Sequence, residues 1–283
     1  MNDKYYYKTC GRFAIHERRF VFITTPIKNN KEKAMKQNVK KYYKNVKDWD
    51  FDMFEIESET LTNWDFYEIL KKISNKNSKI LDLGTGGGEK VTKYFPECEE
   101  ILGTDYLEEM IETANKNLKT SGRKNISFRV MDNLKMDVPE NYFDIVVARH
   151  TTIDPKQIYK CLKKGGYLLI RGVEDKDDCY ALKLIFGQGQ GFDSTKSISL
   201  VDYENVLNAG FKEVELVPLY EREYYKNKFL FKKFLEKAPI VSDFSEEGNE
   251  IDEKLLDLYI KDNTFDGKIR LLRRYYGIVA RKI

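Results

Sequence analysis

The most constraining feature of this chain is a glycine-rich turn that directly follows a short apolar stretch. Residues 80–88 read Ile-Leu-Asp-Leu-Gly-Thr-Gly-Gly-Gly, and helix-forming residues follow from Glu89. Glycine adopts positive φ without steric cost, and its missing side chain lets a ligand approach the backbone. Backbone N–H groups at the start of the following helix face the same space. The stretch therefore predicts a strand–loop–helix unit that binds a nucleotide-type ligand.

The spacing of the glycines narrows the kind of ligand. A Walker phosphate loop needs a lysine followed by a hydroxyl residue at a fixed distance, and Lys90 does not fit that pattern. A dinucleotide loop has its third glycine three residues after the second, whereas the glycines here stand at 84, 86, 87 and 88. Asp82 precedes them, and an acid there repels a pyrophosphate but suits a positively charged amine. The pattern Asp-x-Gly-x-Gly-x-Gly resembles the first motif of the class I S-adenosylmethionine-dependent methyltransferases. The alternative is a tight strand–helix loop without a ligand.

The rest of the chain alternates strand and helix patterns. We expect helices at residues 61–73, 89–95, 107–118 and 155–162, and strands at residues 79–83, 100–104, 126–130, 143–148 and 167–173. Such alternation predicts a parallel sheet with helices on both faces. A helix at residues 200–208 and strands at 211–219 and 275–283 follow. This ending is similar to that of class I methyltransferases, whose last strand is inserted antiparallel beside the fifth. The expected fold is therefore α/β, doubly wound, with a seven-stranded and mostly parallel sheet.

The expected domain organisation has three parts. Residues 1–60 form a basic, aromatic N-terminal extension or lid, and residues 61–224 together with 266–283 form the S-adenosylmethionine-binding methyltransferase domain. Residues 225–265 are charged and helical in pattern, and they interrupt the domain before its last strand. We expect this helical insertion to act as a lid over the methyl acceptor.

Composition restricts the partners only in part. The chain has 283 residues and a formal net charge of +3, which is too small to imply a partner. Residues 1–50, however, hold 13 Lys/Arg and 5 Asp/Glu, giving +8, and they are mixed with aromatic residues. Such a segment can hold single-stranded nucleic acid, although we favour a solvated lid. No apolar run approaches the roughly 20 residues of a membrane span, and no signal-peptide pattern opens the chain. We expect a cytoplasmic protein that does not enter membranes.

Cysteine and histidine usage argues against a metal centre. The four cysteines are scattered without a Cys-x-x-Cys pair, and the chain has only two histidines, His16 and His150. This pattern disfavours zinc ribbons, iron–sulfur clusters and multi-histidine sites. We expect reduced, mostly structural thiols and no metal.

The family resemblance implies a set of cofactor-binding residues. Asp82 lies near the ammonium of the methionine moiety, Asp105 accepts from the ribose hydroxyls, Tyr106 packs on adenine and Asp132 accepts from the adenine amino group. Asp105 could instead cap the following helix, and Asp132 could be a turn residue. The complete set expected at the cofactor is Asp82, Gly84, Gly86, Gly88, Asp105, Tyr106, Met131, Asp132, Asn133 and Arg149.

The acceptor side of the site should follow the fourth strand, where the chain reads Arg-His-Thr-Thr-Ile-Asp at residues 149–154. The Asn/Asp-Pro-Pro-Tyr/Phe motif of enzymes that methylate exocyclic base amines is not found there. Cys161 lies too far along to be the nucleophile of a C5-type mechanism. His150 and Arg149 are therefore the candidate catalytic residues. His150 could act as a base, orient the acceptor or simply pack, and Arg149 could bind an anionic acceptor or pair with a surface acid.

These observations predict an S-adenosylmethionine-dependent methyltransferase (EC 2.1.1). The methyl group would move by in-line displacement to an oxygen or nitrogen atom of a small-molecule acceptor. The alternative is an RNA methyltransferase that holds RNA with its basic N-terminal segment. A third class, a cofactor-binding protein without catalysis, is less well supported because the glycines and acids are intact.

Overall fold

The computed structural model describes residues 52–238, 240–241 and 250–283. The basic segment at residues 1–50 and its expected secondary structure lie outside the described residues, as does His16. Among the described residues, none of the helices is long and apolar enough to cross a membrane.

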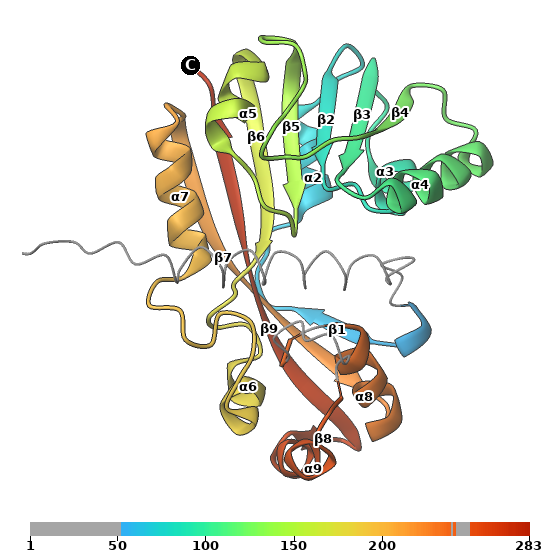
Figure 1. The fold of residues 1–283 in the computed structure, drawn as a ribbon, viewed down its shortest axis with the longest axis vertical. Coiled ribbons are helices and arrows are strands. Elements are labelled where there is room, and N and C mark those ends of the chain that lie inside the picture. The colour runs from blue at the N-terminus through green and yellow to red at the C-terminus, as the bar shows by residue number, and fades with distance from the viewer. Residues whose placement is uncertain (1–51, 239, 242–249) are drawn as a thin grey trace, which may run out of the picture.

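One sheet organises the molecule (Figure 1), and its path runs β1-β7-β9-β6-β5-β2-β3-β4. All seven strands predicted from the sequence are present. Its parallel part consists of β2 (Lys79–Leu83), β3 (Glu100–Asp105), β4 (Ile126–Val130), β5 (Phe143–Arg149) and β6 (Leu162–Val173). The last long strand, β9 (Lys268–Arg281), lies antiparallel between β6 and β7 (Lys212–Tyr225). The mostly parallel sheet with an inserted antiparallel strand is therefore confirmed. In the described part of the chain, two short strands extend it: β1 (Glu57–Thr60) beside β7, and β8 (Thr264–Phe265) beside β9.

Helices cover both faces of the sheet. The residues that pack on one face come from α2 (Phe66–Ile73), α3 (Glu89–Tyr94) and α4 (Glu108–Ser121), and those on the other from α5 (Pro155–Cys161) and α7 (Ile198–Asn208). Local sequence sets the helix ends. The Asp154 carboxylate accepts from two N–H groups at the start of α5, and Pro155 occupies the first turn, where its missing N–H costs nothing.

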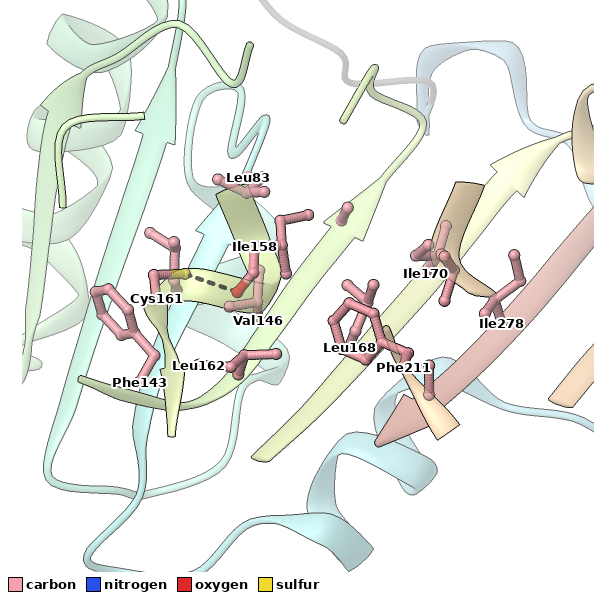
Figure 2. Close-up of a cluster of buried hydrophobic side chains, with 14 of the residues drawn as sticks. Leu83, Phe143, Val146, Ile158, Cys161, Leu162, Leu168, Ile170, Phe211 and Ile278 are labelled. Carbon is pink, nitrogen blue, oxygen red and sulfur yellow. Dashed lines mark hydrogen bonds between the residues drawn. The ribbon is translucent and has the colours of Figure 1, made fainter. Parts of the chain in front are cut away.

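The core between the sheet and α5 is made of strand residues that alternate toward one face. Figure 2 shows Leu83 and Val146 beside Ile158 of α5, whereas Leu168 and Ile278 lie farther along the sheet, toward Phe211. These side chains are fully buried. The burial explains why the strands appear in the sequence as nearly continuous apolar runs.

The start of β6 differs from the prediction. We expected a turn at Gly165–Gly166 and a strand only from residue 167, but β6 begins at Leu162. The register with β5 shifts between the pairs Phe143↔Leu162 and Ile145↔Tyr167. Gly165 has φ +85 within this irregularity. The glycine pair therefore forms a bulge inside a longer strand, because the two glycines absorb the extra residues without ending the pairing.

The lower halves of β7 and β9 leave the main sheet and carry a second lobe (Figure 1). Their pairing continues from Lys212↔Arg281 to Tyr225↔Ile269. Around this ribbon lie α6 (Tyr180–Phe186), α8 (Lys228–Lys237) and α9 (Glu253–Asp262). A separate cluster of buried side chains, including Tyr225, Phe231, Leu256 and Tyr259, forms the core of the lobe. In the described residues of the predicted helical insertion, α8 and α9 thus pack on the β7–β9 ribbon.

A buried ion cluster joins three segments of this lobe. Arg273 on β9 donates through Nε to Asp178 at 3.0 Å and through Nη1 to Glu223 on β7 at 3.1 Å. The Tyr225 hydroxyl donates to Glu223 at 2.7 Å, and the Arg274 N–H donates to Asp178 at 2.7 Å. Because each acid has a cationic and a neutral donor, the cluster satisfies the requirement for burying charge.

Candidate cofactor and acceptor site

The predicted site residues gather at the carboxyl edge of the parallel strands. The loops after β2, β3, β4 and β5 all leave the sheet at this edge, where ligands bind in open α/β sheets. A shallow cavity of about 490 Å³ lies at the opposite edge, lined in part by Ser78, Asp144 and Lys163. Asp144 there accepts from the backbone of Lys79 at 2.8 Å and pairs with Lys163 at 2.9 Å. It anchors strand starts, so the chemistry belongs to the carboxyl edge.

The glycine-rich turn has the backbone that its sequence implies. Gly84, Gly86 and Gly88 have φ of +71, +58 and +73. A Cβ on Gly84 would lie 2.7 Å from the Cβ of Thr151, which belongs to the loop after β5. A Cβ on Gly88 would lie 2.7 Å from the ring of Phe128. Gly84 therefore permits the two ligand-side loops to touch, whereas Gly88 permits the helix after the turn to pack closely on the sheet.

Asp82 is a buried carboxylate whose two oxygens are unsatisfied. Its exposed fraction is 0%, and neither oxygen has a hydrogen-bond partner among the described residues. The cation beside it is Arg149, whose Nη2 lies 3.6 Å from Oδ2. Burial raises the pKa of Asp82, and the Arg149 guanidinium together with the nearby Thr85 hydroxyl counteracts this shift. A buried acceptor without a donor is costly, so the arrangement fits a group that receives a positively charged ligand.

Arg149 points into the aromatic layer beneath the turn. Its Nη1 donates to the Tyr67 hydroxyl at 2.8 Å. The guanidinium carbon lies 5.6–5.7 Å from the ring centres of Phe66, Tyr67 and Phe95. The side chain is 14% exposed, so Arg149 pairs with a buried acid rather than with a surface one. Tyr67 was not predicted from the sequence as a site residue.

Asp105 supports the glycine-rich turn at the end of β3. Its Oδ2 accepts from the N–H of Gly86 at 3.0 Å, and its Oδ1 accepts from the N–H of Leu107 at 3.0 Å. Burial raises the pKa of Asp105, while these backbone donors oppose the shift. Each oxygen keeps a further lone pair for a ligand hydroxyl. Tyr106 follows with 46% of its surface exposed, beside the same edge.

The three residues after β4 have different surroundings. Met131 is 6% exposed and packs into the core. The Oδ1 of Asp132 accepts from the Leu134 N–H at 2.9 Å, which is a local turn contact. Asn133 donates to the Thr151 hydroxyl at 3.0 Å, and its own Oδ1 is buried without a partner. Asn133 thus links the loops after β4 and β5 and offers an unsatisfied acceptor to the site.

His150 directly follows β5 and adopts the left-handed conformation, with φ +52. Its ring stacks on Tyr275 at 5.6 Å between centres, with an interplanar angle of 7°. The ring is reached by solvent although many protein atoms surround it. These surroundings, together with the cationic Arg171 and Arg149, lower the pKa of His150, so the imidazole is neutral at pH 7. A neutral imidazole can accept a hydrogen bond from an acceptor group.

The structure therefore brings most of the predicted residues together at the carboxyl edge of the sheet, and further residues lie beside them. Hydrogen bonds or an ion pair connect Asp82 to Arg149, Asp105 to Gly86, and Asn133 to the loop that carries Thr151. Sequence reasoning missed Tyr67 and Tyr275, and it placed Thr151 in the acceptor-side stretch without giving it a role. Thr151 is adjacent to His150, which could have drawn attention to it, whereas no local pattern distinguishes Tyr67 or Tyr275.

The described cysteines do not supply a nucleophile. Cys98, Cys161 and Cys179 are buried and free. Burial raises the pKa of Cys161 to about 12, so it remains a thiol at neutral pH. This agrees with the interpretation of these residues as reduced structural thiols.

Comparison with known proteins finds similarity over the part of the chain that carries the site. Residues 74–206 match a family described as a methyltransferase domain. The chain is 26% identical over 91 residues to the uncharacterized methyltransferase YcgJ of Bacillus subtilis, covering 32% of this chain and 36% of YcgJ. It is 32% identical over 104 residues to the ribosomal protein L11 methyltransferase of Listeria innocua, covering 35% and 33%. It is 34% identical over 106 residues to the phosphoethanolamine N-methyltransferase of Plasmodium falciparum, covering 34% and 39%. The chain thus spans little more than a third of these relatives.

The solved structure of YcgJ shares the fold. It superposes with a TM-score of 0.50 at 17% identity, covering 76% of this chain and 96% of YcgJ. The matched family region contains every predicted cofactor residue from Asp82 to Arg149.

Proposed function

We propose that this chain, whose residues 74–206 match a methyltransferase domain, uses S-adenosylmethionine to move a methyl group to an oxygen or nitrogen atom of a small-molecule acceptor. The activity class follows from the domain. The acceptor class and the residue roles are our inference from the site.

The residues at the carboxyl edge fit S-adenosylmethionine. Asp82 would bind the ammonium of the methionine moiety, the backbone from Gly84 to Gly86 would line its path, and Asp105 would accept from the ribose hydroxyls. Tyr106 would pack on adenine. When bound, the cofactor supplies a methyl group that its sulfonium already activates. The protein therefore has to align the acceptor and hold its lone pair toward that methyl group.

The observation that carries this proposal is the unsatisfied carboxylate of Asp82. It is fully buried, and no hydrogen bond of ordinary length reaches either oxygen among the described residues, although the Arg149 guanidinium and the Thr85 hydroxyl lie near enough to favour the charged form. A strand–helix loop without a ligand would gain stability from an apolar residue at this position, because a buried acceptor without a donor costs about 1–3 kcal/mol. A ligand ammonium would satisfy both oxygens.

On the acceptor side, we propose that His150 orients the acceptor. Because its pKa is lowered, the imidazole is a weak base at neutral pH and a better hydrogen-bond acceptor than proton remover. Its ring is held by stacking on Tyr275, which restricts its orientation.

A small acceptor is favoured by the position of the second lobe. The lobe lies beyond the carboxyl edge of β5 and β6 (Figure 1), where it would limit access by a large substrate. We propose that α8 and α9 belong to a cover over the acceptor. Two of the relatives are named for their acceptors, one a small molecule, phosphoethanolamine, and the other a protein, ribosomal protein L11. The alternative RNA acceptor rests on residues 1–50, which lie outside the described residues.

The test combines cofactor binding with an acceptor screen. Calorimetry should show S-adenosylmethionine binding to the wild-type chain, and Asp82→Asn should weaken it at least tenfold. Asp144→Asn removes the same charge at the opposite edge of the sheet and should leave the affinity within twofold. Absence of binding to the wild type would refute the cofactor assignment.

Labelled S-adenosylmethionine incubated with cell extract then separates the acceptor classes. Transfer that survives RNase treatment and passes a small-pore filter supports a small molecule. Loss of transfer after RNase treatment would instead support RNA, and an RNA complex should weaken steeply with salt.

A further inference from the structure

Arg149 and Asp82 are neighbours that do not form the tight pair their chemistry allows. A guanidinium beside a carboxylate ordinarily makes charge-assisted hydrogen bonds of about 2.7–2.9 Å, often two in parallel. Here Nη2 and Oδ2 are 3.6 Å apart. Both oxygens of Asp82 and the Nε of Arg149 are buried without a hydrogen-bond partner among the described residues. Something therefore holds the two groups apart.

The restraint comes from α2 and the segment that follows α3. The Tyr67 hydroxyl accepts the Nη1 proton of Arg149 at 2.8 Å, the strongest contact of the guanidinium. The rings of Phe66, Tyr67 and Phe95 surround the guanidinium at 5.6–5.7 Å. Tyr67 is itself fixed, since its ring contacts those of Phe66 at 5.3 Å and Tyr94 at 5.1 Å. A rigid acceptor thus competes with Asp82 for the arginine.

We propose that Tyr67 is a positioning residue that holds Arg149 back from Asp82, which keeps the Asp82 carboxylate open for the ammonium of the cofactor. This inference rests on the proposed function. At its present distance Arg149 is close enough to favour the ionised carboxylate but does not occupy its lone pairs. A closer arginine would occupy the position that the ammonium requires.

Removing the hydroxyl should release the arginine. In Tyr67→Phe, the guanidinium loses its acceptor while the aromatic ring stays, so Arg149 can close on Asp82 and form hydrogen bonds with it. The ammonium then has to displace those bonds. We expect the affinity for S-adenosylmethionine to fall about tenfold, the ratio that corresponds to roughly one hydrogen bond.

The discriminating measurement uses two ligands in calorimetry. S-adenosylhomocysteine carries the ammonium, and its deaminated analogue lacks it. Tyr67→Phe should weaken S-adenosylmethionine and S-adenosylhomocysteine about tenfold but leave the deaminated analogue within twofold of its wild-type affinity. Tyr94→Phe is the matched control, because its ring adjoins Tyr67 and no hydrogen bond of its hydroxyl to Arg149 is observed. It should change neither affinity.

A double variant tests whether the effect of Tyr67→Phe depends on Arg149. In Arg149→Met, no guanidinium can close on Asp82, so adding Tyr67→Phe should cause no further loss. If Arg149→Met does not fold, Arg149→Lys serves, and the effect of Tyr67→Phe there should be smaller than in the wild type.

The outcomes separate the two claims. A wild-type chain that binds none of the ligands refutes the proposed function and this inference with it. A wild type that binds, with Tyr67→Phe unchanged for S-adenosylhomocysteine, overturns the inference alone. Equal losses for the two ligands also overturn it, since a general disturbance of the loop would not depend on the ammonium.

Discussion

Replacing Arg273 by methionine tests whether the buried ion cluster stabilises the second lobe. Methionine keeps the apolar stem and removes the charge. In the native chain Arg273 bridges Asp178 and Glu223, whose side chains are only 3% and 9% exposed. The variant would leave both carboxylates buried without their counter-ion.

Two arguments give the same magnitude for the loss. Breaking a buried ion pair by removing one partner costs about 3–5 kcal/mol. Alternatively, one of the two acids can bind a proton, which removes its uncompensated charge. Protonating an ordinary carboxyl with a pKa near 4 costs about 4 kcal/mol at pH 7. The acids keep their neutral donors, the Tyr225 hydroxyl and the Arg274 N–H. We therefore expect the free energy of unfolding to fall by about 4 kcal/mol at pH 7.

The loss should depend on pH in a defined direction. The folded variant would bind a proton that its unfolded chain releases at neutral pH, so its stability relative to the wild type rises as the pH falls. At pH 5 the proton costs about 1.4 kcal/mol. The difference between variant and wild type should shrink to about 1–2 kcal/mol.

Urea denaturation followed by circular dichroism at pH 7 and pH 5 measures both quantities. The control is Arg222→Met on the same ribbon, whose partner Glu59 lies at 3.1 Å in an exposed pair with side chains 39% and 51% accessible. Exposed pairs contribute about 0–1 kcal/mol. A loss for Arg273→Met below about 1 kcal/mol at pH 7, or one that does not shrink at pH 5, would refute this reasoning.

Four further measurements address the site. Asp105→Ala should weaken S-adenosylmethionine about 100-fold in calorimetry, because two charge-assisted hydrogen bonds to ribose are lost; unchanged affinity would remove Asp105 from the site. His150→Ala should lower turnover about tenfold with cofactor affinity nearly kept, and undiminished turnover would indicate a packing role. Gly84→Ala should destabilise the fold more than Gly122→Ala in thermal melts, because both have φ near +70 but only Gly84 would place a Cβ 2.7 Å from another side chain; equal losses would show that this contact relaxes. Since burial raises the pKa of Asp82, the ionised form that binds ammonium is lost as the pH falls through a value above that of an ordinary aspartate. Cofactor affinity measured from pH 8 to pH 5 should therefore decline at the acidic end, and a flat profile would contradict the ammonium contact.

The sequence predicted the central strands well because most are apolar runs bounded by polar residues, and β4 alternates apolar and polar residues. The strands at residues 79–83 and 126–130 have the predicted bounds. The early part of β9 was missed, since residues 268–274 read Lys-Ile-Arg-Leu-Leu-Arg-Arg and look exposed. Their burial depends on β7 and on the second lobe, which local periodicity does not encode. The short helix α6 was also missed, and its buried Leu182 belongs to the core of the second lobe.

The site divides in the same way. The positions of Asp82, Gly84 and Asp105 at the carboxyl edge of the sheet were predictable, because one motif and one strand end define them. Tyr67 was not, since its hydrogen bond to Arg149 joins residues 82 positions apart. The helix that carries Tyr67 was recognised by its buried stripe, and that stripe says nothing about a neighbouring hydroxyl.

Strand register places charged side chains of β5, β6, β9 and β7 in one row on the same face of the sheet. Arg149 is paired with Arg171 across β5 and β6, and residues paired in register point to the same face of a sheet. On β9 the same face carries Tyr275 and Arg273, and on β7 it carries Glu221, which pairs with Arg171. Two arginines in direct register repel one another, and each is turned toward an acid on its other side. The row therefore runs from the acid beside the glycine-rich turn, through β5 and β6, to the β7–β9 ribbon of the second lobe.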